Sequence, residues 1–122
     1  MSVKCHIAFY EPEEKDLNNF EALIYKHHDG EPENTLPLIE PILKDFDKNK
    51  GLDDIGYASA WLVAKLKHDY LNIGISKSFH GDIEYIYAVY PDRIEAYEVD
   101  IGKFSTKDIV PALKKIKIVK LN

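Results

Sequence analysis

Alternation of apolar and polar residues is the feature that most restricts the fold of this chain. "VKCHIAFY" (3–10) and "DIEYIYAVY" (82–90) both repeat with a period of two, which is typical of β-strands with one face buried. "FEALIYKH" (20–27) follows the first stretch and "RIEAYEVD" (93–100) follows the second, the latter after a tight Pro91-Asp92 turn. The chain must therefore build a sheet, and consecutive strands predict antiparallel pairs.

Two helices are predicted between these strand pairs. In 33–46, apolar residues recur at helical spacing after a cap at Asn34 or Thr35, and Pro41 predicts a late start or a kink. "IGYASAWLVAKLKHDY" (55–70), capped by Asp53 or Asp54, has a wide apolar arc that indicates burial across a sheet face.

The remaining segments complete the predicted order. "NIGIS" (72–76) is a short strand, Ser105 is positioned to begin a last helix, and "IKIVKL" (116–121) is either a closing strand or a frayed tail. The order is β-β-α-α-β-β-β-α, with a final strand left open. This segregation predicts one α+β domain spanning 1–122, an antiparallel sheet with helices packed on one face.

Composition restricts the function classes. The chain is acidic, with a formal charge of −5, so a nucleic-acid partner is not expected. The C-terminal lysines (114, 115, 117 and 120) are interpreted as a solvated face of the last helix and tail. No apolar run approaches 18 residues and no secretory signal is evident, which predicts a cytoplasmic protein without a membrane span. The single cysteine, Cys5, is expected to be buried and inert.

"YKHHDGEPEN" (25–34) carries the first candidate site. Residues two apart share a face of a strand, so His27 and Asp29 are expected side by side at the sheet margin. Gly30 permits a positive φ, so the chain can turn sharply after the carboxylate. The N-terminus of the following helix lies close by and favours anions.

A second cluster of the same type occurs at "FHGDIEY" (79–85). If the two loops converge, His27, Asp29, His80 and Asp82 would suffice to hold a divalent metal, with His28 and Glu84 in reserve. The same groups could act as a metal-free acid–base pair, or simply close turns. No spacing matches a known ligand signature, so no cofactor is required.

Tyrosines are concentrated in the second strand pair. They are expected to be core or half-buried residues of the sheet, and they are Tyr85, Tyr87, Tyr90 and Tyr97.

"IYKHHDGEPE" (24–33) resembles a motif of small uncharacterised prokaryotic and phage proteins, with the pattern Tyr-Arg/Lys-His-x-Asp-Gly-x-Pro-Glu. In that group the motif precedes a helix, an Ala-rich helix like "IGYASAWLVAKLK" and a strand like "IEYIYAV". The resemblance implies that these positions form the site: Tyr25, His27, Asp29, Gly30, Pro32, Glu33, Glu84, Tyr85 and Tyr87. His28 and Glu31 depart from the pattern, standing where aromatics are common. The group has no established activity, so the resemblance implies a site and no reaction.

Taken together, the sequence predicts a small binding or interaction domain. Its site would be the rim formed by the 27–30 segment with Glu84 and Tyr85; the binding residues are His27, Asp29, Gly30, Glu84 and Tyr85. A protein partner or a second copy is expected at an exposed strand edge. The alternative is a metal-assisted hydrolase that uses His27, Asp29, His80 and Asp82.

Overall fold

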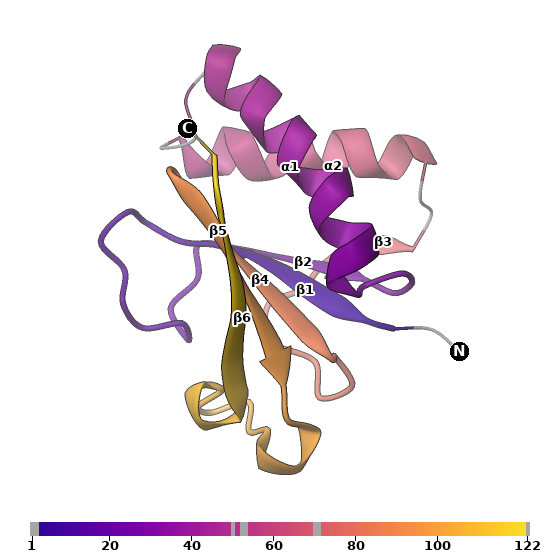
Figure 1. The fold of residues 1–122 in the computed structure, drawn as a ribbon, viewed down its shortest axis with the longest axis vertical. Helices are drawn as coiled ribbons and strands as arrows, with labels where there is room; N and C mark the ends of the chain where they lie inside the picture. The colour runs from indigo at the N-terminus through magenta and orange to yellow at the C-terminus, as the bar shows by residue number, and fades with distance from the viewer. Residues whose placement is uncertain (1–2, 50, 52–53, 70–71, 122) are drawn as a thin grey trace.

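The structure is a computed structural model that describes residues 3–49, 51, 54–69 and 72–121. Within these residues it contains a sheet of six strands and two α-helices (Figure 1). The elements are, in chain order, β1 (Cys5–Phe9), β2 (Ala22–Lys26), α1 (Pro32–Asn49), α2 (Ile55–Asp69), β3 (Ile73–Ile75), β4 (Tyr85–Tyr90), β5 (Arg93–Val99) and β6 (Leu113–Lys120).

The sheet is mixed, with strand order β3-β2-β1-β4-β5-β6. Neighbouring strands are antiparallel except β1 and β4, which run parallel with Ile7 opposite Tyr87. The α+β class is confirmed, but the prediction of a purely antiparallel sheet is wrong. After β3 the chain returns to the other side of β1, and it enters β4 in the same direction as β1.

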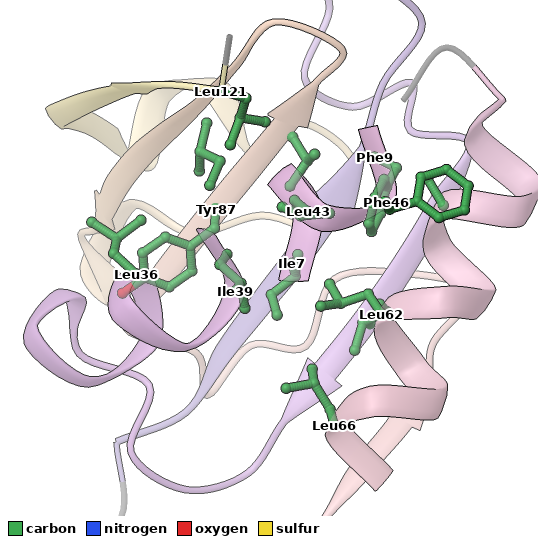
Figure 2. Packing of buried hydrophobic residues seen from close by; sticks show 14 of the residues in the cluster. Ile7, Phe9, Leu36, Ile39, Leu43, Phe46, Leu62, Leu66, Tyr87 and Leu121 are labelled. Carbon is green, nitrogen blue, oxygen red and sulfur yellow. The ribbon is translucent and has the colours of Figure 1, made fainter. Parts of the chain in front are cut away.

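Both helices pack on one face of the sheet (Figure 1). Figure 2 shows residues of this cluster from the two helices and the sheet: Ile7, Phe9, Leu36, Ile39, Leu43, Phe46, Leu62, Leu66, Tyr87 and Leu121. We call this face of the sheet the helix face. Helix α1 begins at Pro32 and continues through Pro37 and Pro41, so of the late start or kink predicted from Pro41 the late start is wrong. Burial of its apolar stripe against the sheet outweighs the hydrogen bond lost at each internal proline.

Helix α2 begins where the sequence predicted. Asp54 directly precedes it, and the Asp54 carbonyl accepts a hydrogen bond from the Ala58 N–H. Asp53, the other predicted cap, and Tyr70, the predicted end, lie outside the described residues. None of the helices in the described ranges is long and apolar enough to cross a bilayer.

The opposite face of the sheet, which we call the loop face, is covered by irregular segments. A second apolar cluster joins the sheet to residues of three connections, 10–21, 76–84 and 100–112; these residues include Leu17, Phe79, Ile83, Ile109 and Ala112. The connections are fastened by side-chain hydrogen bonds, such as Tyr10 Oη to the Leu17 carbonyl at 2.7 Å and the Ile109 N–H to Asn18 Oδ1 at 2.9 Å.

Two further predictions concern the end of the chain. The helix predicted from Ser105 is wrong: the segment forms short 3₁₀ turns at Ile101–Lys103 and Val110–Ala112, because Asp and Ser side chains bond nearby backbone N–H groups and Pro111 interrupts any longer helix. Of the alternatives left open for the tail, the structure shows a strand, β6, and not a helix face as the lysines had suggested.

Candidate functional site

The turn that carries the first candidate site is fastened through its backbone carbonyls. Strand β2 ends at Lys26, so strand alternation does not extend to His27 and Asp29. The buried ammonium of Lys26 donates to the carbonyl of His28 and, at 2.8 Å, to that of Asp29. Thr35 Oγ1 on α1 also donates to the Asp29 carbonyl, at 2.9 Å. The turn residues 27–31, which we call the carbonyl turn, therefore satisfy a buried lysine and join β2 to α1.

Gly30 lies at the point of closest approach between this turn and β1. Its N–H donates to the Val3 carbonyl at 2.9 Å, and its own carbonyl accepts from Tyr87 Oη at 2.6 Å. A Cβ at this position would lie 2.9 Å from the Val3 carbonyl oxygen and 3.0 Å from the Cys5 nitrogen. The left-handed residue of the turn is Asp29, with φ of 55°, and not Gly30 as predicted. Glycine is required here for space.

Burial sets the chemistry of the groups beneath the carbonyl turn. Burial lowers the pKa of Lys26 from its ordinary value, although nearby acidic groups act in the opposite direction. Burial raises the pKa of the Cys5 thiol to about 12, so the thiol is neutral at physiological pH. The prediction that Cys5 is buried is confirmed.

Replacing Tyr87 by phenylalanine is expected to lower the free energy of unfolding by about 1–2 kcal/mol, because the Gly30 carbonyl would lose its partner inside the protein. Urea denaturation measures the change. Tyr90→Phe is a matched control, since Tyr90 is also buried but its hydroxyl makes a longer bond of 3.4 Å to the Glu14 carbonyl. Equal losses in the two variants would contradict a special role for the bond to Gly30.

Histidines and a tyrosine gather on the loop face around Tyr25. The Tyr25 hydroxyl lies 3.1 Å from His27 Nδ1, and its ring stacks on His80 with centroids 4.3 Å apart. Burial raises the pKa of Tyr25, and the nearby Asp82 carboxylate raises it further. His80 Nε2 lies 3.1 Å from Ser76 Oγ. The two loops singled out in the sequence thus do converge, through Tyr25.

A third histidine, His6, is buried beneath this group and its tautomer is fixed by its partners. His6 Nδ1 lies 3.1 Å from the Ile24 carbonyl and must donate to it, while Nε2 accepts from the His80 N–H at 3.0 Å. Both ring nitrogens of the neutral imidazole are therefore used. Burial lowers the pKa of His6 from 6.5 to about 4. His6 was not a predicted site residue. Alternation in a strand indicates only on which face of the sheet a side chain lies, and not which groups it contacts.

The metal hypothesis gains little from this geometry. Across the described ranges, no group of three or more His, Cys, Asp or Glu side chains is placed to hold a metal ion. His27, His80 and Asp82 meet around Tyr25, whereas the Asp29 side chain is exposed and its backbone belongs to the carbonyl turn. The metal-assisted hydrolase remains a prediction.

Glu84 directly precedes β4, and Tyr85 is the first residue of that strand. Tyr85 packs on Tyr87 with ring centroids 6.4 Å apart, so it is linked to Gly30 through Tyr87. Burial raises the pKa of Tyr85, and the neighbouring carboxylates, Glu98 first, raise it further. Both residues line an open groove of about 580 Å³ at the end of the sheet. As predicted, the four tyrosines of β4 and β5 are buried or half-buried.

The exposed edge of the sheet offers a different kind of site. Within the described ranges, strand β6 is the last strand of the sheet and pairs only with β5 (Figure 1). Its side chains are exposed along most of its length. Ile116 and Ile118 are 40% and 53% exposed. The sequence signal for β6 was the run of lysines and β-branched residues in "LKKIKIVK", which has the composition of a strand. The alternation is incomplete, because a bulge interrupts the strand between the partners of Ala96 and Tyr97.

Comparison with known proteins adds no assignment. No protein-family model matches the chain, and neither a curated protein nor a solved structure is significantly similar to it. The resemblance to the motif group stays a prediction, and function has to be inferred from the geometry of the molecule.

Proposed function

We propose that this protein is a small protein-binding module that holds an extended segment of a partner by strand addition to the outer edge of β6. The observation that supports this most directly is an eight-residue edge strand, free of proline, with two exposed isoleucines. Strand addition obtains affinity from main-chain hydrogen bonds and specificity from alternate side chains.

The two edge strands of the sheet, β3 and β6, differ in their capacity for strand addition. The opposite edge strand, β3, has three residues, too few for a stable ladder, although its Ile75 is 70% exposed. Strand β6 is longer than the mean strand of globular proteins, which has about 5–6 residues. An added strand would therefore pair with β6 in preference to β3.

A groove beside β6 supplies room for partner side chains. It lies between α1 and β6, has a volume of about 550 Å³, and is lined by apolar residues from both elements, Leu36 and Pro37 from α1 and Ile116 and Val119 from β6. Apolar side chains of a partner on the helix face could enter it, which would bury part of the exposed surface of β6.

Binding is expected to be detectable with short strand-forming peptides. We would titrate isotope-labelled protein with two eight-residue peptides, one alternating threonine and valine and one alternating glutamate and valine, and follow backbone amide exchange by NMR. Slower exchange of outward-facing β6 amides with at least one peptide is expected, with Kd on the order of 10 µM. Strand addition is wrong if neither peptide protects β6, or if β3 is protected equally.

The exposed isoleucines provide the matched variants. The double substitution Ile116→Ser with Ile118→Ser is expected to weaken peptide binding at least tenfold, because apolar contacts on both sides of the added strand are lost. Ile75→Ser on β3 removes a more exposed isoleucine from the other edge and should leave the affinity unchanged. Similar losses in both variants would show that binding is not localised to β6.

A further inference from the structure

The charge of β6 identifies the kind of partner. Strand β6 contains four lysines and no acidic residue, whereas the rest of the chain has twelve basic against 21 acidic residues, a net charge of −9. The lysines of β6 are Lys114, Lys115, Lys117 and Lys120. Among the described residues, β6 is therefore both the longer of the two edge strands and a strongly basic element of an acidic protein.

Most of this charge is not neutralised within the molecule. Lys115 lies 3.5 Å from a carboxylate oxygen of Glu95 on β5, and that carboxylate is already bound by Arg93. In the part of the chain that the structure describes, Lys114, Lys117 and Lys120 form no ion pair. In the register Lys120 is opposite Arg93, a like charge, whereas Lys114 is opposite Glu98, an opposite charge. The strand edge thus has positive charge available for a partner.

The lysines fall on both faces of β6. Lys117 is opposite Ala96, a residue of the helix-face cluster, whereas Lys115 is opposite Tyr97, a residue of the loop-face cluster. An added strand would pass between two rows of ammonium groups. Directly opposed charges of opposite sign stabilise a strand pair and like charges destabilise it.

We infer that the partner of β6 is an extended acidic segment of another protein, in which Asp or Glu alternates with β-branched residues. This inference rests on strand addition at β6, the proposed function. The same lysines disfavour pairing with β6 of a second copy of this protein, because the four ammonium groups of one strand would then lie against the four of the other. Lysines on an edge strand are a known protection against self-pairing, and here they also define what can pair.

The acidic surroundings of the edge distinguish a peptide from a nucleic acid. Glu33 and Glu40 line the groove between α1 and β6, and Glu84 and Glu98 line the groove at the start of β6. A continuous phosphate backbone would be repelled by these carboxylates, whereas a strand with alternating side chains can present apolar side chains to the groove that Glu33 and Glu40 line and its carboxylates to lysines of the edge.

The test compares three octamers that alternate valine with glutamate, threonine or lysine and so carry negative, no or positive side-chain charge at four positions. The acidic peptide is expected to bind β6 about fivefold more tightly than the neutral one, because its glutamates lie on one face and can form two cross-strand Glu–Lys pairs of ordinary strength, and the basic peptide is expected not to bind. The advantage of the acidic peptide should fall steeply between 50 and 500 mM NaCl.

Two variants of equal charge make the test specific. Lys114→Gln, Lys117→Gln and Lys120→Gln together should abolish the preference for the acidic peptide, whereas Lys15→Gln, Lys77→Gln and Lys107→Gln, all exposed and outside β6, should preserve it. Equal binding of acidic and neutral peptides would overturn the acidic partner and leave strand addition intact, while no protection of β6 by any peptide would overturn both. Binding of a 12-residue oligothymidine as tightly as the acidic peptide, or dimerisation through β6, would overturn the acidic segment as the partner.

Discussion

Replacing Gly30 by alanine is expected to lower the free energy of unfolding by about 3 kcal/mol, the upper part of the range for overpacking a tight contact. The added methyl group would lie 2.9 Å from the carbonyl oxygen of Val3 and 3.0 Å from the backbone nitrogen of Cys5, which cannot move away as the end of a side chain could. A shift of the turn away from β1 would instead lengthen three sets of hydrogen bonds. These are the bond from the Gly30 N–H to Val3, the bond from Tyr87 to the Gly30 carbonyl, and the bonds from Lys26 to the carbonyls of the turn.

Gly56→Ala is the control for this substitution. Gly56 lies in the first turn of α2, and a Cβ there would meet nothing within 4 Å, so the change should be neutral or stabilise by up to about 1 kcal/mol. Chemical denaturation of both variants measures the difference. A Gly30→Ala variant as stable as the parent protein would show that the carbonyl turn is not tightly fixed against β1.

Acidification is expected to destabilise the protein by about 3 kcal/mol through His6 alone, the equivalent of a pKa lowered from 6.5 to about 4. The unfolded chain binds a proton at this imidazole near pH 6.5, whereas in the folded protein the imidazole stays neutral until the pH approaches 4. The contribution is therefore fully present above pH 6.5, is lost as the pH falls towards 4, and does not change further below that pH. Protonation would also remove the acceptor for the His80 N–H and loosen the 76–84 connection.

His6→Gln isolates this contribution from the carboxylates that titrate in the same range. Glutamine can still donate and accept hydrogen bonds in this position but does not titrate, so the pH dependence of stability between pH 6.5 and 4 should become about 3 kcal/mol shallower. The comparison requires urea denaturation at several pH values. Parallel curves for the variant and the parent would mean that His6 is protonated as easily in the folded protein as in the unfolded chain.

The sequence predicted the local elements well and the long-range pairing poorly. The alternation around Ile7 and Tyr87 marked β1 and β4 as strands, but nothing in either stretch indicates that they run parallel, since that depends on where α2 and β3 return the chain. Strand β6 was only one of two alternatives, because exposure on both faces removes the period-two signal and a bulge at its centre shifts the register.

The sequence predicted which residues form the candidate site better than it predicted which of their atoms interact. The sequence directed attention to 25–34 and to His80 and Asp82, and the structure brings His27, His80 and Asp82 around Tyr25. It could not reveal that the carbonyl oxygens of the turn are the interacting groups, because every residue type has a carbonyl. Lys26 is a charged residue near the end of a strand, yet it is buried, because the carbonyls of His28 and Asp29 accept hydrogen bonds from its ammonium.

The parallel pairing of β1 with β4 has a consequence for how the protein is made on the ribosome. Cys5 and Tyr85 are opposite each other in the sheet and eighty positions apart in the chain. At about 5–20 residues per second, β1 waits roughly 4–16 s for that neighbour to be synthesised. Until then one side of β1 has an open backbone edge, and the hairpin with β2 and the two helices must shelter it. The middle of the sheet can therefore close only after both helices and β3 have been synthesised, and β5 and β6 are added to it afterwards.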